Sequence, residues 1–319
     1  MEIYKTRSAI ASKSNWLLSL VVTVLVSFGV LALLQGLAVL LVHPIFNIPL
    51  DELIAVLTSQ SANPNARMAF LFVQGLGAGF GFIVAAFLIA KLIDKADMGY
   101  KQQLANFKFI PFVIMLFVLF GGMMFNALLI DLNGNVQFPA FLSELEKVLR
   151  EKEDELMALT KYLTDFDSTT ELMMGILVIG VLAGLGEELL FRGVLQPKLH
   201  QYTGNAHLGV WITAFIFSAI HFQFYGFFPR MLLGGIFGYL YLYSGSLVYP
   251  IIAHILNNTF TVVLVYLNKL GKVEFDIEQT NTVSWPIALG GLIILLISLR
   301  LFKDKSKPII TDEKLEQSI

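Results

Sequence analysis

Apolar residues run through the sequence in stretches long enough to cross a lipid bilayer, for which a helix needs about 20 residues. From these stretches we predict about eight membrane helices, of which the sixth is short. Their expected bounds are 16–42, 68–90, 109–130, 172–198, 207–227, 231–243, 249–267 and 282–299. The pattern therefore predicts an all-α fold, a polytopic bundle of membrane helices.

The loop 131–171 follows a different pattern. Apolar residues recur at helical spacing from Phe138 to Phe166, and acidic residues such as Glu153 and Asp154 occupy the other face. We predict an amphipathic helix that lies on the outer surface or caps the bundle. A solvated linker helix is the simplest interpretation. A role in substrate binding is an alternative that the residue pattern does not support.

The distribution of polar residues divides the chain into three parts. Residues 1–171 hold the first three membrane helices and the acidic loop, and residues 172–268 hold nearly all the polar groups within predicted helices. Residues 269–319 hold the last helix and a polar tail.

Basic residues gather at the ends of the predicted helices. Lys5, Arg7 and Lys13 precede the first helix, and further basic residues lie between helices two and three and after helix eight. The positive-inside rule then places both termini in the cytoplasm, in agreement with an even number of helices. We expect an integral, multi-pass protein of a bacterial inner membrane or a plasma membrane.

The composition supports the membrane assignment and narrows the chemistry. Only 14% of residues are charged, against about 25% in soluble domains, and the mean hydropathy is +0.72. A formal net charge of -2 without a basic patch argues against a nucleic-acid partner. The chain has no cysteine, which excludes disulfides, thiolate metal sites and cysteine nucleophiles. The partner that the composition indicates is the lipid bilayer.

The fourth predicted helix carries three charged residues, Glu187, Glu188 and Arg192. An ionisable group within a membrane costs at least about 2.5 kcal/mol and marks a functional site by default. Glu188 and Arg192 are four residues apart and can pair on one face of the helix. Glu187 points about 100° away and is left free.

Two later helices carry the other polar residues that apolar packing does not explain. His221 ends the fifth helix, and His254 and Asn258 lie one turn apart in the seventh. Glu187 and His221 are equally distant from the turn at Gly204, so they lie at the same depth if both helices run up to that turn. We expect a site in the cytoplasmic half of the bundle, open to water from that side.

Together these residues form three motifs, Glu-Glu-x-x-x-Arg, Phe-x-x-x-His and His-x-x-x-Asn, in this order on separate helices. The set resembles that of the CPBP family, which comprises CAAX prenyl proteases and bacteriocin-processing (Abi) enzymes related to the Ras-converting CAAX endopeptidase. The resemblance covers roughly residues 172–266. It implies an intramembrane peptidase with a CPBP-type catalytic helical core at 172–268.

The resemblance also implies a role for each motif residue. Glu187 would be the general base that activates a water molecule, and His221 would position that water. His254 and Asn258 would stabilise the oxyanion of the tetrahedral intermediate. Glu188 and Arg192 of the first motif would form a structural pair that holds the helix. The candidate catalytic residues are thus Glu187, Glu188, Arg192, His221, His254 and Asn258.

The sequence leaves the requirement for a metal open. His221, His254 and a carboxylate such as Glu187 could supply the three protein ligands of a catalytic zinc. The motif His-Glu-x-x-His is absent from the sequence, so glutamate-type and metallo-type hydrolysis both remain. No other cofactor is indicated.

These observations favour an endopeptidase that cleaves a membrane-associated substrate, either CAAX-like or a peptide precursor. The alternative is a non-proteolytic membrane protein, such as an immunity factor or a scaffold that retains the fold. A transporter ranks last, because the polar residues concentrate in the second half of the chain and do not form two related halves.

Overall fold

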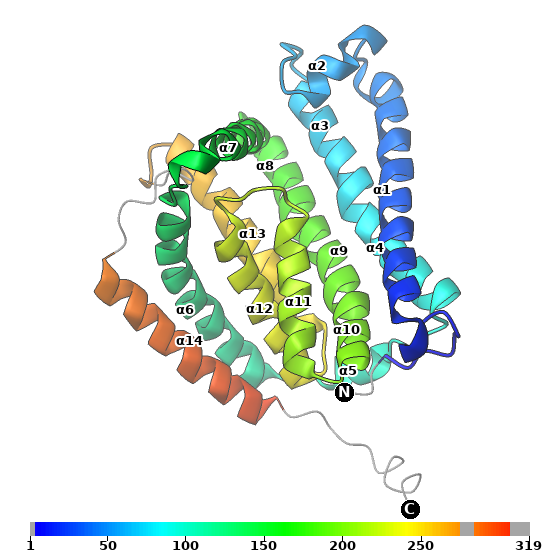
Figure 1. Ribbon diagram of the computed structural model, residues 1–319. Coiled ribbons are helices and arrows are strands. Elements are labelled where there is room, and N and C mark those ends of the chain that lie inside the picture. Colours follow the sequence, from blue (N-terminus) through cyan, green and yellow to red (C-terminus); the bar gives the residue numbers. More distant parts are fainter. Residues whose placement is uncertain (1–3, 275–283, 307–319) are drawn as a thin grey trace, which may run out of the picture.

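The computed structural model describes residues 4–274 and 284–306, and its long helices form a bundle (Figure 1). The helices before the acidic loop are α1 (Trp16–Phe46), α2 (Leu53–Leu57), α3 (Ala66–Gln74), α4 (Phe80–Leu88), α5 (Tyr100–Ala105) and α6 (Phe109–Gly134). The loop holds α7 (Ser143–Thr164). The remaining helices are α8 (Thr169–Gly175), α9 (Ala183–Leu190), α10 (Gln196–Thr203), α11 (Ala206–Ala219), α12 (Phe227–Ser244), α13 (Val248–Lys269) and α14 (Trp285–Lys305). The prediction of a helical membrane bundle is confirmed, and the described residues contain no strand.

Within the described residues, six continuous helices are long and apolar enough to cross a membrane. They are Lys13–Phe46, Ala66–Ile93, Phe109–Gly134, Thr169–Thr203, Val248–Lys269 and Trp285–Lys305. The expected count of eight is not confirmed, because neither α11 nor α12, which the segments 207–227 and 231–243 form, is among these six. The 14 residues of α11 extend only about 21 Å, against a hydrocarbon core of about 30 Å. The expected start of the last helix at residue 282 and most of the polar tail lie outside the described residues.

The helix Thr169–Thr203 is not uniform. Two π-helical stretches, Ile176–Leu182 and Phe191–Leu195, separate α8, α9 and α10. A π-helical turn leaves the regular ladder of backbone hydrogen bonds, and such turns are frequent at functional sites. Both stretches adjoin motif residues, since α9 carries both glutamates and the second stretch carries Arg192.

Small residues bring the later helices close together. A Cβ atom on Gly184 of α9 would lie 2.9 Å from Ile255 Cγ1 and 3.0 Å from the Ile255 backbone nitrogen in α13. A Cβ atom on Gly234 of α12 would lie 3.2 Å from Ala214 Cα in α11. Close backbone approach of this kind drives helix association in membranes. It places α9, α11, α12 and α13 around one centre.

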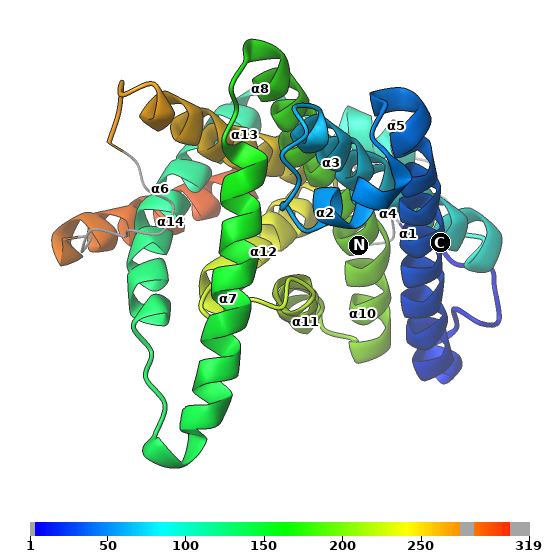
Figure 2. The same cartoon turned by 90° about the horizontal axis from the view of Figure 1, so that it is seen from above.

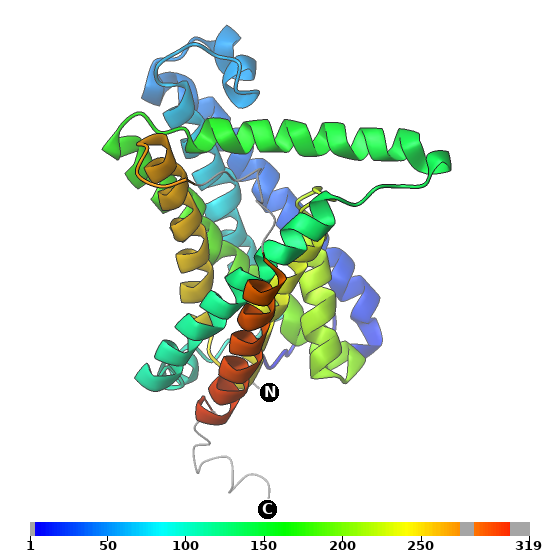
Figure 3. The same ribbon diagram turned by 90° about the vertical axis from the view of Figure 1, so that its left-hand side faces the viewer.

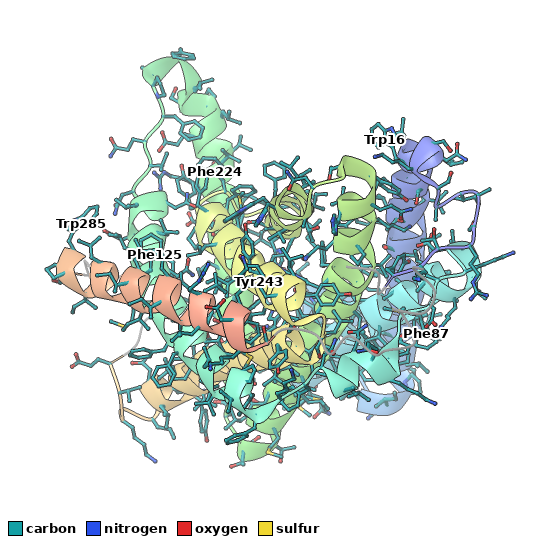
Figure 4. All side chains as sticks on the ribbon, turned by 90° about the horizontal axis from the view of Figure 1, so that it is seen from below. Trp16, Phe87, Phe125, Phe224, Tyr243 and Trp285 are labelled. Atoms are coloured by element: carbon teal, nitrogen blue, oxygen red, sulfur yellow. The ribbon has the colours of Figure 1, made fainter. Side chains whose placement is uncertain are left out.

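The amphipathic helix expected in the acidic loop is α7. It lies across one end of the bundle, nearly perpendicular to the long helices (Figure 3), and passes over α12 and α13 when the bundle is seen from that end (Figure 2). The helix α1 begins and α14 ends at the opposite end of the bundle (Figure 1). The outer sides of the bundle are apolar, and Trp16, Phe87 and Trp285 project from its periphery (Figure 4). This distribution fits a lipid environment.

Candidate active site

The expected pair Glu188–Arg192 is present, and both side chains are fully buried. Arg192 Nη1 donates a hydrogen bond to Glu188 Oε1 over 2.7 Å. Arg192 Nη2 donates to the carbonyl oxygen of Gly234 in α12 over 2.8 Å. The guanidinium also lies over the rings of Phe217 and Phe237, at 4.8 and 5.6 Å from their centroids. Arg192 therefore links α9 to both α11 and α12.

Glu188 also holds His254. His254 Nδ1 lies 2.8 Å from Glu188 Oε1, the oxygen that accepts from Arg192. This contact directs Nε2 of the ring toward Glu187, whose Oε2 lies 3.8 Å away. That separation is too long for a direct hydrogen bond. The sequence predicted the pairing of Glu188 along its own helix but not this contact across 66 residues.

His221 is fixed just after the end of α11. Its Nδ1 lies 2.8 Å from the carbonyl oxygen of Phe217, so in the neutral ring Nδ1 is the donor and Nε2 carries the lone pair. The ring of Phe217 stands between the two histidines, 5.3 Å from His221 and 5.9 Å from His254. Phe222, the next residue, has a φ of 56°, which is an unusual backbone conformation for an aromatic residue and clusters at functional sites.

One cavity of about 620 Å³ joins these groups. Glu187, His221, His254 and Asn258 all line it, although they come from three separate helical segments. Glu188 and Arg192 do not line the cavity, but Glu188 contacts His254, which does. The structure thus brings together the four residues to which the motifs point and places the ion pair where it supports one of them.

Comparison with known proteins matches residues 169–260 to the family described as type II CAAX prenyl endopeptidase Rce1-like. This segment of the chain is similar to the Rce1-like family. The match begins at the start of α8 and ends within α13, so it contains every motif residue. The resemblance to the CPBP family is confirmed over this segment.

Two proteins of Bacillus subtilis (strain 168) are similar to the chain. One is named "Putative membrane peptidase YdiL" and is 28% identical over 119 residues, which are 37% of this chain and 46% of that protein. The other is named "Uncharacterized protein YpbD" and is 32% identical over 83 residues, or 25% of this chain and 39% of that protein. The chain thus matches less than half the length of either relative. No solved structure matches it.

Asn258, the last motif residue, uses both ends of its side-chain amide in hydrogen bonds. Asn258 Nδ2 donates to the carbonyl oxygen of Ile179 over 3.0 Å, within the π-helical stretch before α9. Its Oδ1 accepts from Asn257 Nδ2 over 3.2 Å. Asn257 also lines the cavity, a position that the motif spacing does not reveal.

A further polar residue of the cavity comes from outside the Rce1-like segment. Asn126 of α6 lines the cavity, and its buried Oδ1 has no hydrogen-bond partner among the described residues. The sequence predicted no site residue in the first three membrane helices, because nearly all polar groups within predicted helices lie in residues 172–268. An amide in the middle of an apolar helix was the signal that could have identified Asn126.

The expectation that the site opens at the end where α1 begins is wrong. The cavity extends from the Rce1-like motifs toward α7, which contributes Arg150, Glu153, Asp154 and Met157 to its lining. Figure 1 shows α7 at the opposite end of the bundle from the start of α1. Depth along single helices could not reveal this, because side-chain packing decides where a cavity continues.

Glu153 fastens α7 to the loop that follows His221. Its Oε1 accepts from Gln223 Nε2 over 3.0 Å, and its Oε2 accepts from the backbone N–H of Tyr225 over 3.1 Å. Burial raises the pKa of Glu153 above its ordinary value, although the hydrogen bond from Tyr225 opposes this shift. The acidic loop is therefore not a separate solvated linker at this point.

The described residues hold no ready-made cluster of ligands for the zinc that the sequence left open. No group of three or more His, Cys, Asp or Glu side chains within 4–274 and 284–306 is arranged to hold a metal ion. Glu187, His221 and His254 share the cavity, and each histidine engages Nδ1 with another group, as metal-bound histidines also do. We therefore derive no step through a metal.

Proposed function

We propose that the protein is an intramembrane endopeptidase that hydrolyses a peptide bond of a membrane-associated substrate. The observation that carries this proposal is the convergence of Glu187, His221 and His254 on one cavity within an Rce1-like segment. Substrates of the CAAX type or peptide precursors follow from the resemblance of that segment. A peptide bond requires an activated water and donors directed at the developing oxyanion.

Glu187 serves as the general base in this proposal. It has no ion-pair partner among the described residues other than His254, at 3.8 Å. Its carboxylate takes a proton from water as the water oxygen attacks the carbonyl carbon. The same proton then passes to the amide nitrogen as the C–N bond breaks. His221 positions the water, because Nε2 of its neutral ring is free to accept a hydrogen bond.

His254 and Asn258 face the oxyanion. Glu188 accepts the Nδ1 proton of His254 and stabilises positive charge on the ring, so Nε2 can carry a second proton and donate to the oxyanion. Asn258 retains one amide hydrogen beyond the one given to Ile179. One such donor contributes about 2.7–4 kcal/mol to transition-state stabilisation.

The decisive variant is Glu187→Gln, which preserves shape and removes the base. Full-length protein in lipid nanodiscs would be incubated with a prenylated CAAX peptide and with unprenylated peptides, and products would be identified by mass spectrometry. We expect a loss of cleavage of at least about 100-fold, the lower range for general acid–base catalysis. Glu144→Gln, at an exposed position of α7, is the control and should retain full activity.

Three results would separate the remaining alternatives. Full activity of a folded Glu187→Gln protein would remove the glutamate-base mechanism. Loss of activity with a chelator, restored by added zinc, would favour metallo-type hydrolysis. A wild-type protein that cleaves none of these peptides, together with an unchanged cellular phenotype in Glu187→Gln, would favour the immunity or scaffold alternative.

A further inference from the structure

Arg230 lies near the start of α12 and lines the cavity that contains Glu187. Its Nη2 donates to Gln223 Oε1 over 2.8 Å. Its Nη1 is buried and has no hydrogen-bond partner among the described residues. None of the ion pairs formed by residues 4–274 and 284–306 includes Arg230. The proposed hydrolysis by Glu187, His221, His254 and Asn258 does not require this guanidinium.

The guanidinium is held in a fixed position. Gln223, which accepts from Nη2, is itself bound through its Nε2 to Glu153 of α7. Both oxygens of Glu153 are engaged by Gln223 and by the Tyr225 backbone, so Glu153 orients Arg230 only through Gln223. On its other side the guanidinium lies against Gly226, where a Cβ atom would come within 3.3 Å of Nη2.

The other described basic residues of the interior and of this cavity have acidic partners. Arg192 pairs with Glu188 over 2.7 Å, and the fully buried Lys198 pairs with Asp94 over 2.8 Å. Arg150, which lines the same cavity, pairs with Glu146 over 2.8 Å. The Arg230 side chain is partly buried, and a desolvated cation without an anionic partner is costly. Arg230 therefore differs from the other three in a way that packing does not explain.

We propose that Arg230 binds a carboxylate of the peptide substrate. This inference rests on the proposed peptidase function and specifies one feature of the substrate. Arginine donates to carboxylates through charge-assisted hydrogen bonds, which are about twice as strong as neutral ones. Nη1 is the donor available to the ligand, since Nη2 is held by Gln223. The carboxylate belongs either to the chain terminus or to an acidic side chain, and its capture fixes which peptide bond faces Glu187.

The acidic residues nearby set the direction of approach. Glu187 and Glu153 line the same cavity as Arg230, and Glu187 must stay clear of a substrate carboxylate to remain the base. A carboxylate bound at Nη1 leaves the carbonyl of a preceding peptide bond to face Glu187. The interaction therefore selects substrates by the spacing between their acidic group and the bond to be cleaved.

The test uses matched fluorescent peptides and full-length protein in nanodiscs. One pair carries a free or an amidated C-terminus, and a second, amidated pair carries Glu or Gln at an internal position. Cleavage is measured with wild type, Arg230→Gln, Arg230→Lys and the control Arg300→Gln, whose side chain is 72% exposed. Equilibrium binding of the same peptides is measured in a Glu187→Gln background, with and without Arg230→Gln.

We expect wild type and Arg300→Gln to prefer one carboxylate-bearing peptide by about tenfold or more, mainly through KM. Arg230→Gln should lose that preference, and Arg230→Lys should restore part of it. The pair that shows the preference identifies the source of the carboxylate. A wild type without preference, or an Arg230→Gln protein that keeps it, would overturn the proposal.

The binding measurement separates this inference from the peptidase proposal. Carboxylate-selective binding that depends on Arg230, without cleavage by wild type, would support the carboxylate site and refute the peptidase function. Cleavage that depends on Glu187 but shows no carboxylate preference would support the peptidase function and refute the carboxylate site. If Arg230→Gln melts at a much lower temperature than wild type, the comparison is made with Arg230→Lys, which keeps the charge.

Discussion

The substitution Glu188→Gln tests whether one buried carboxylate supports both the bundle and the site. Arg192 Nη1 and His254 Nδ1 converge on Glu188 Oε1 at 2.7 and 2.8 Å, while Oε2 has no hydrogen-bond partner among the described residues. Glutamine preserves the volume and one accepting oxygen. It removes the negative charge that neutralises a fully buried guanidinium.

The magnitude follows from the burial of the pair. Removing one partner of a buried ion pair leaves the other charge uncompensated and costs about 3–5 kcal/mol. For chains of about 150–250 residues each kcal/mol lowers the melting temperature by roughly 2–4 °C, and on that scale we expect a fall of roughly 6–20 °C. Cleavage activity should fall as well, because His254 loses the acceptor that fixes its orientation.

The assay is thermal unfolding of purified protein in one detergent at one heating rate, since unfolding of such proteins is often irreversible. Arg192→Met and the double variant Glu188→Gln/Arg192→Met complete a double-mutant cycle. The double variant should melt at a higher temperature than the sum of the single losses predicts, because no unpaired charge remains. Strictly additive losses, or an unchanged melting temperature in Glu188→Gln, would refute this reasoning.

Two further predictions concern packing and membrane orientation. Gly184→Ala places a Cβ atom within 3.0 Å of Ile255 in α13, so it should lower both the melting temperature and peptide cleavage. Gly36→Ala, with no atom within 4 Å of its new Cβ, should lower neither, and equal effects of the two substitutions would contradict the packing argument. Because the chain has no cysteine, a single cysteine at exposed Ser14 or Glu155 can report on sidedness. If both termini are cytoplasmic, a membrane-impermeant maleimide should label Glu155→Cys in intact cells and Ser14→Cys only after lysis, and the opposite pattern would reverse the proposed orientation.

The orientation has a direct consequence for the proposed substrate. The cavity extends toward α7, so cytoplasmic termini would place its α7 end on the outer side of the membrane. A peptide would then reach Glu187 from that side. The inverted labelling pattern would instead give access from the cytoplasm, where prenylated CAAX chains reside.

The sequence determined the features that depend on neighbouring positions along the chain. Apolar stretches of membrane length and the i,i+4 spacing of Glu188 and Arg192 predicted the bundle and its buried pair, because helical periodicity is a local property. The order of the motifs, again readable from the chain alone, indicated which family the later segment resembles.

Only the tertiary structure decided what each polar group faces. It placed His254 on Glu188, added Asn126 and Arg230 to the cavity, and directed that cavity toward α7. It also showed that α11 is shorter than the predicted segment 207–227 and that α12 is longer than the predicted segment 231–243. These features arise from close packing between helices distant in sequence, which depends on how side chains such as Gly184 and Gly234 allow backbones to approach. No periodicity within a single helix contains that information.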